Sequence, residues 1–185
     1  AAVAAGIAML KTGEIRYTPA SGTPRMKDAI IGYTERFYGR KVERANVMAS
    51  AGAKQAIMVA LQAILNPQEE VIFPAPYWVS YPEMVKLCGA IPVPVKPEDG
   101  TFYPRLQDIE QVTTSYTRAV IINSPNNPSG AVYDREFVTG IIRLGEERDL
   151  FVLMDDIYHR LVFEGLCPRC TREAEASGKD LSNLQ

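Results

Sequence analysis

Short apolar segments of strand length alternate with helical segments along most of this 185-residue chain. The clearest apolar runs are AVII at 119–122 and FVLM at 151–154. Such runs are typical of strands that are buried on both faces of a parallel sheet. Because parallel strands are joined by crossover helices, the alternation predicts βαβ units with right-handed crossovers. We therefore expect the α/β class, a three-layer αβα arrangement with a mostly parallel sheet and helices on both faces.

The expected element boundaries follow from capping residues and apolar periodicity. Thr23-Pro24 starts a helix and Gly39 ends it, since Thr caps the first turn and Pro is tolerated at the first helical position. Two prolines within 91–95 indicate that this strand lies at a sheet edge or is irregular. The helix from about 53 is apolar nearly all round, so we expect it to be buried. The expected helices are about 1–12, 24–38, 53–65, 79–88, 105–111 and 134–148, and the expected strands 46–50, 70–73, 91–95, 118–123 and 151–154.

The composition argues against several classes of function. Hydrophobic residues make up 46% and charged residues 23%, which is ordinary for a globular protein. A net charge of −2 gives no reason to expect nucleic acid as the main partner, and no apolar run approaches the ~20 residues of a membrane span. Three cysteines favour a reducing compartment over a disulfide framework. Cys167 and Cys170 form a lone CxxC with a single His, at 159, so no zinc site is expected.

Chemically unusual residues gather in the loops that follow predicted strands. In open α/β sheets, ligands bind just beyond the carboxyl ends of the strands. Asp155 ends the apolar run at 151–154, and Tyr158 lies one turn further along. A lone carboxylate at such a place is costly unless it meets a cation or several donors. Asp155 is therefore a candidate ligand contact, and the alternative is that it caps the following turn while Tyr158 packs.

Three other loops carry candidates of the same kind. The turn Gly52-Ala53-Lys54 opens a helix, where backbone N–H groups and the helix dipole favour an anion such as phosphate. Trp78, the only Trp, offers a flat face to a planar ligand. Asn127 lies in the most specific run, NSPNNPSG, and can donate to a ligand oxygen. Taken alone, the turn at 52–54 is more simply explained as a tight strand–helix turn, and Trp78 as a core or interface aromatic.

Together these groups suit a planar, phosphorylated heteroaromatic ring that carries an oxygen. Pyridoxal phosphate is such a molecule. Its ring nitrogen would meet the carboxylate, and its phosphate would meet the helix N-terminus. A dinucleotide is disfavoured, because the turn AGAKQA at 51–56 is not the GxGxxG that a dinucleotide site needs.

Four segments of the sequence resemble a known family. NSPNNPSG, MDDIY, AGAKQAI and APYWVSYPEM resemble the class I aminotransferases of fold type I, in the bacterial aspartate and aromatic branch, from about Ile15 to Gly165. The resemblance implies pyridoxal-phosphate-dependent transfer of an amino group between an L-amino acid and a 2-oxo acid. It also implies a cytoplasmic homodimer that uses neither nucleic acid nor a membrane. The expected domains are 1–22, a remnant of the N-terminal segment and linker; 23–165, a partial large cofactor-binding domain; and 166–185, a divergent tail.

The resemblance also implies roles for individual residues. Asp155 would pair with the pyridinium nitrogen and keep the ring cationic. Tyr158 and Asn127 would hydrogen-bond the ring oxygen, and Trp78 would stack on the ring. Trp78 and Asn127 would also contact the substrate. The phosphate would be held by the backbone of Gly52, Ala53 and Lys54, and by Tyr17 from the neighbouring subunit.

The sequence departs from the family in ways that bear on catalysis. The family's Schiff-base lysine lies in a Ser-x-x-Lys segment beyond Asp-x-x-Tyr, and no such segment occurs here; Lys179, in SGKDLSN, does not match. The arginine that grips the substrate carboxylate and the N-terminal segment of the small domain are also missing. Position 53 is Ala where relatives often have Gly, and the CPRC tail is unlike the family. We therefore expect a fragment or truncated product that ends before the lysine, holds most of the cofactor-binding domain and does not turn over alone.

Two alternative functions remain open from the sequence. A carbon–sulfur lyase of the same fold would use the same cofactor for elimination, and fold alone does not settle the reaction. A non-catalytic regulator with an aminotransferase-like domain would carry a basic DNA-binding module upstream.

Overall fold

The computed structural model describes residues 1–14, 16–97 and 100–163. They form two compact units, one of residues 1–50 and one from residue 51 onward. The three segments predicted above remain a prediction, and the tail at 166–185, with Cys167, Cys170 and Lys179, lies outside the described residues.

The N-terminal unit, residues 1–50, contains helix α1 (Ala2–Lys11), helix α2 (Pro24–Tyr38) and the 3-10 turn η1 (Arg44–Asn46). Both predicted helices are confirmed. The Thr23 hydroxyl accepts the Met26 N–H at 3.2 Å, and Gly39 closes α2 in the left-handed conformation with φ 67°. These are the start and stop that the sequence indicated.

The strand predicted at 46–50 is wrong. Residues 47–50 form no strand, although the Ala49 N–H donates to the Ser21 carbonyl at 3.0 Å. That contact is with a loop, so no ladder develops. The approach is close: a Cβ on Gly22, whose φ is 98°, would lie 2.6 Å from the Cβ of Ala49. Glycine is therefore required at position 22 both by its dihedral angle and by space.

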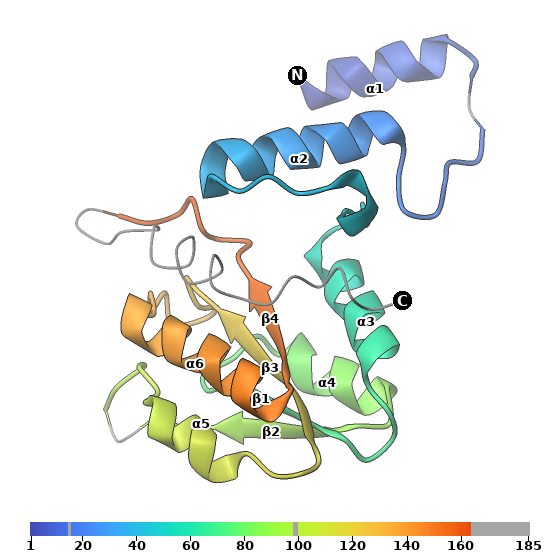
Figure 1. Cartoon of the computed structure of the whole chain (residues 1–185). Coiled ribbons are helices and arrows are strands. Elements are labelled where there is room, and N and C mark those ends of the chain that lie inside the picture. Colours follow the sequence, from blue (N-terminus) through green and yellow to red (C-terminus); the bar gives the residue numbers. More distant parts are fainter. Residues whose placement is uncertain (15, 98–99, 164–185) are drawn as a thin grey trace. The chain divides into compact units, whose positions relative to one another are not determined.

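The second unit is built on a four-stranded sheet with all neighbouring strands parallel, in the order β2-β1-β3-β4 (Figure 1). This confirms the predicted α/β class. The strands are β1 (Glu70–Pro74), β2 (Ile91–Val95), β3 (Thr117–Asn123) and β4 (Phe151–Asp155), and the helices are α3 (Ala53–Ile64), α4 (Ser80–Leu87), α5 (Leu106–Val112) and α6 (Arg135–Arg148). The proline-containing strand β2 lies at an edge, as expected.

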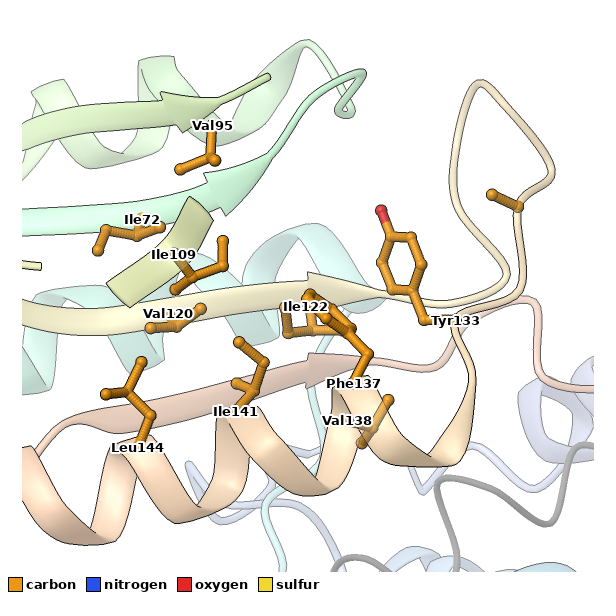
Figure 2. Close-up of a cluster of buried hydrophobic side chains, with 11 residues drawn as sticks. Ile72, Val95, Ile109, Val120, Ile122, Tyr133, Phe137, Val138, Ile141 and Leu144 are labelled. Carbon is orange, nitrogen blue, oxygen red and sulfur yellow. The ribbon is translucent and has the colours of Figure 1, made fainter. Parts of the chain in front are cut away.

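Alternate residues of the strands supply two hydrophobic cores, one on each face of the sheet. Ile72, Val120 and Ile122 pack with Ile109 of α5 and Ile141 of α6 (Figure 2). The residues between them in sequence face the other way. Val71, Phe73, Ala119 and Ile121 pack with α3 and α4 around Ile57, Leu61, Tyr81 and Val85. The two cores make the predicted three layers.

Two burial predictions were wrong. Strand β4, expected to be buried on both faces, is half-buried along its whole length, because it pairs only with β3 among the described residues and forms the edge of their sheet. Helix α3, expected to be buried all round, buries only Ile57 and Leu61 fully. Gln55 and Gln62 are exposed, so α3 covers the sheet with one face.

Candidate functional site

The register of β3 and β4 places Asn123 directly opposite Asp155, at the carboxyl edge of the sheet. A cavity of about 260 Å³ lies at this edge. The structure brings to it every residue of the second unit that the sequence singled out: Gly52, Ala53, Lys54, Trp78, Asn127, Asp155 and Tyr158. Asn123 and Ile157 also line the cavity, and the sequence analysis did not single them out.

Asp155 is held by three contacts. Its carbonyl accepts the side-chain N–H of Asn123 at 2.9 Å, which ties the ends of β3 and β4 together. Its Oδ1 accepts the backbone N–H of Ile157 at 3.3 Å. Its Oδ2 accepts the hydroxyl of Tyr81 at 2.7 Å. The carboxylate is half-buried and lines the cavity wall, so it can accept a further donor from a ligand.

Tyr81 lies in the first turn of α4 and is 1% exposed. Its ring contacts the indole of Trp78 edge-on, with centroids 5.6 Å apart, and the ring of Phe73 at 6.0 Å. Burial raises the pKa of the Tyr81 hydroxyl, and its hydrogen bond to Asp155 raises that pKa further. The hydroxyl therefore keeps its proton and remains a donor to the carboxylate over the ordinary pH range.

The loop after β3 is fixed by bonds among its own residues. The Asn127 N–H donates to Asn123 Oδ1 at 2.7 Å, and the Ser129 hydroxyl donates to Asn126 Oδ1 at 2.7 Å. The backbone N–H of Asn126 donates to the Ala131 carbonyl at 2.8 Å. Asn123 and Asn126 are buried, and the side-chain oxygen of each accepts one of these bonds. The Asn127 side chain is left at the cavity wall.

The start of α3 and Trp78 also line the cavity. Gly52 precedes the helix with φ 94° and provides no side-chain cap. The first N–H groups of a helix have no partner inside it, so those at Ala53 and Lys54 are suited to an anion. The Lys54 ammonium lies 5.0 Å from the centroid of the Trp78 ring and adds positive charge at this end.

Tyr17 is fully exposed and lies in the N-terminal unit, between α1 and α2. Its predicted role in a neighbouring subunit remains a prediction. Tyr81 was not singled out from the sequence, although it belongs to the APYWVSYPEM segment and lies one helical turn after Trp78. Asn123 was part of the NSPNNPSG run, where two amides at a strand end were the available signal.

Comparison with known proteins identifies the family. A model of the family "Aminotransferase class I and II" matches residues 1–181. The chain belongs to the class I and II aminotransferases. This family is generally pyridoxal-phosphate-dependent. The finding confirms the resemblance inferred from the four sequence segments.

Named relatives place the chain near aspartate aminotransferases. It is 40% identical over 158 residues to the aspartate/prephenate aminotransferase of Thermus thermophilus, covering 84% of this chain and 41% of that protein. It is 45% identical over 149 residues to an aspartate aminotransferase of Streptomyces avermitilis, covering 80% of this chain and 36% of that protein. The chain therefore spans less than half the length of these relatives.

Solved structures agree with the sequence comparison. The aspartate aminotransferase of Thermotoga maritima superposes with a TM-score of 0.85 at 34% identity, over 91% of this chain and 46% of that one. Thermus thermophilus aspartate aminotransferase with maleate superposes with a TM-score of 0.80 at 39% identity, over 88% of this chain and 44% of that one. The fold of this aminotransferase-family chain is thus that of fold type I.

Among residues 1–14, 16–97 and 100–163, no helix has the length and apolar character that a membrane span requires. Among the same residues, no group of three or more His, Cys, Asp or Glu side chains could hold a metal ion.

Proposed function

We propose that this chain is the cofactor-binding part of an enzyme that transfers an amino group between an L-amino acid and a 2-oxo acid, using pyridoxal phosphate. The observation that carries the proposal is one cavity with an anion-binding helix start and a lone carboxylate, Asp155, in its walls. The family membership and the aspartate aminotransferase names of the relatives support it.

The donor set fits the cofactor. Pyridoxal phosphate needs an anion site for its phosphate, an acceptor for its ring N–H, a donor for its ring oxygen and a flat face. The backbone at Ala53 and Lys54 is suited to the phosphate, and the Asp155 carboxylate to the ring N–H. The Asn127 amide is suited to the ring oxygen, and the Trp78 indole offers the flat face. Tyr158 adds a phenol at the same cavity. When bound, the cofactor acts as an electron sink for the substrate carbanion.

Each of these residues has a separate task in the proposal. Asp155 keeps a proton on the ring nitrogen, because a carboxylate favours a cationic partner. Asn127 and Tyr158 hydrogen-bond the ring oxygen. The Trp78 indole stacks on one face of the ring and excludes water from that face. The Lys54 ammonium favours anionic ligands in this cavity. Trp78 and Asn127 would also contact the substrate, and their position in the cavity lining supports this assignment.

The assembly and the location are part of the same proposal. Tyr17 would complete the phosphate site of a neighbouring subunit, which makes the functional unit a homodimer. The compartment would be the cytoplasm, in keeping with three cysteines among 185 residues. Because this sequence has no Ser-x-x-Lys segment, the 185 residues alone would bind the cofactor without catalysing amino-group transfer.

Binding and turnover can be tested separately on the 185-residue chain. Trp78 is the only Trp, so its fluorescence reports directly on a ligand at the cavity. We expect saturable quenching by pyridoxamine 5′-phosphate, which has no aldehyde to react with surface lysines, and none by pyridoxamine. Absence of saturable quenching would contradict the cofactor assignment. Incubation with pyridoxal phosphate, aspartate and a 2-oxo acid should give no steady oxo-acid product, and steady turnover would contradict the inactivity of these residues alone.

A further inference from the structure

The carboxylate of Asp155 is held by neutral donors from two different places. The Tyr81 hydroxyl, from α4, donates to Oδ2 at 2.7 Å, and the backbone N–H of Ile157 donates to Oδ1 at 3.3 Å. The second bond is long, so the Tyr81 contact is the stronger of the two. Tyr81 thus provides the main side-chain restraint on the carboxylate.

The surroundings of Tyr81 fix where its hydroxyl can be. Its side chain is 1% exposed and packed against Phe73 and Trp78. A buried aromatic ring in this position has little rotamer freedom, and its hydroxyl finds its partner in Asp155. Because burial raises the pKa of this hydroxyl, the donor does not ionise at neutral pH.

The neutrality of the donor matters for what Asp155 can still do. An Arg or Lys in the same place would cancel the charge of the carboxylate, whereas a phenol leaves that charge available to a ligand cation. A carboxylate has about four lone-pair directions. One direction on Oδ2 is taken by Tyr81 and one on Oδ1 by Ile157, which leaves acceptor capacity on both oxygens.

We propose that Tyr81 is a positioning residue that orients the Asp155 carboxylate in the cavity wall, so that Asp155 holds a protonated ring nitrogen. The proposal rests on the proposed function, since it requires a heteroaromatic ligand. It goes beyond that function by assigning the control of the ring's protonation to a residue of α4. Tyr81 acts only through Asp155 and itself makes no contact with the ligand.

The test uses pyridoxamine 5′-phosphate with the full 185-residue chain and two readouts. Trp78 quenching gives the dissociation constant, and a pH titration of ligand absorbance in the complex gives the midpoint for ring-nitrogen protonation. For Tyr81→Phe we expect a dissociation constant roughly tenfold higher and a midpoint about one pH unit lower, since the lost bond is to a charged group. Tyr77→Phe is the matched control, because Tyr77 also packs on Phe73 but lies outside the cavity lining. It should change neither readout.

A double-mutant cycle separates positioning from packing. If Tyr81 acts through Asp155, then Tyr81→Phe has no further effect on either readout in an Asp155→Ala background. A persistent effect there would show a packing role and overturn the proposal. Circular dichroism checks that each variant is folded. Asp155→Glu provides a second route that leaves Tyr81 intact, because it keeps the charge but moves the oxygens by one methylene. We expect a comparable loss, and full affinity in that variant would also overturn the proposal.

The outcomes distinguish this inference from the proposed function. If the wild-type chain binds and Tyr81→Phe matches it in affinity and midpoint, the positioning role is wrong and the cofactor assignment stands. If the wild-type chain shows no saturable binding, the cofactor assignment fails and the positioning role fails with it.

Discussion

The two strand ends that meet at the cavity are stabilised in different ways. The loop after β3 is held by its own residues, since Asn127, Asn126 and Ser129 bond within a few positions of one another and of Asn123. The carboxylate after β4 instead depends on a hydroxyl 74 residues away in the sequence, that of Tyr81. The first arrangement is local and the second is tertiary.

The local hydrogen bonds maintain the conformation of the loop after β3, whereas the tertiary contact from Tyr81 controls the orientation of the Asp155 carboxylate. A loop whose buried amide oxygens accept hydrogen bonds from its own residues depends for its conformation on its own sequence. A carboxylate restrained by a distant side chain can be perturbed without touching the strand that carries it. Besides the ladder between the two strands, the Asn123 side chain links their ends, since it donates to the Asp155 carbonyl and accepts from the Asn127 N–H.

The largest expected effect removes the charge at the tertiary end. Asp155→Asn keeps the shape of the side chain but not its charge, so it should weaken pyridoxamine 5′-phosphate binding by on the order of 30- to 100-fold. Trp78 quenching measures the change. The unfolding midpoint in denaturant should move little, because the carboxylate is only half-buried. Equal affinity in the two proteins would mean that no ring cation is held there.

The second-largest effect is expected on removing the Asn123 side chain, which links the ends of β3 and β4. Asn123→Ala leaves the Asn127 N–H and the Asp155 carbonyl without their partner, so the free energy of unfolding should fall by about 2 kcal/mol. Denaturant unfolding followed by circular dichroism measures it. Asn123→Asp retains an acceptor for the Asn127 N–H but buries a carboxylate oxygen against the Asp155 carbonyl, so near neutral pH it should be destabilised at least as much. An unchanged stability in Asn123→Ala would show that the strand ends are held independently.

Alkaline pH should reveal the buried tyrosines. Burial raises the pKa values of Tyr81 and Tyr133, so the folded chain keeps these protons while unfolded tyrosines lose theirs near pH 10. Their stabilisation is therefore complete below about pH 10, and each group should lose up to about 1.4 kcal/mol per pH unit above it. Unfolding measured from pH 8 to 11 tests this.

The two tyrosines differ at neutral pH, which gives the control. The Tyr133 hydroxyl is buried and makes no hydrogen bond within the described part of the chain, so Tyr133→Phe should leave stability at pH 7 unchanged or higher. Tyr81→Phe should lower it. Both variants should show a shallower loss above pH 10, and a slope equal to that of the wild type would contradict the assignment.

The smallest expected effect is within the local loop. Ser129→Ala removes the hydroxyl that donates to Asn126 Oδ1 and accepts the Ala131 N–H, and should cost about 1 kcal/mol of stability. Binding of pyridoxamine 5′-phosphate should be within twofold of wild type, since Asn127 remains tied to Asn123. A loss of affinity larger than that of Tyr81→Phe would reverse the comparison between the two ends.

The sequence predicted the fold well where local patterns decide structure. The caps at Thr23 and Gly39, the apolar strands and the edge position of the proline-containing β2 were all readable from neighbouring residues. The strand predicted at 46–50 failed because a short apolar run becomes a strand only if another strand pairs with it. The burial predicted for β4 was wrong for a similar reason, because burial on both faces depends on which strands and helices pack beside β4.

In the candidate site too, residues with a local sequence signal could be predicted and residues that act through tertiary contacts could not. Gly52, Trp78 and Asn127 could be singled out because each lies in a loop with an unusual local sequence. Tyr81 could not, since nothing near position 81 indicates that its hydroxyl reaches the end of a strand 74 residues later. Contacts of that length become visible only once the sheet order is known.

The edge position of β4 has a consequence for how the chain behaves in solution. Within the described residues, the side of β4 turned away from β3 makes no ladder bonds, so it presents a row of N–H and C=O groups to its surroundings. Such a row is a template onto which another extended strand can add. A short extended peptide is therefore expected to bind along this side of β4 as a further strand.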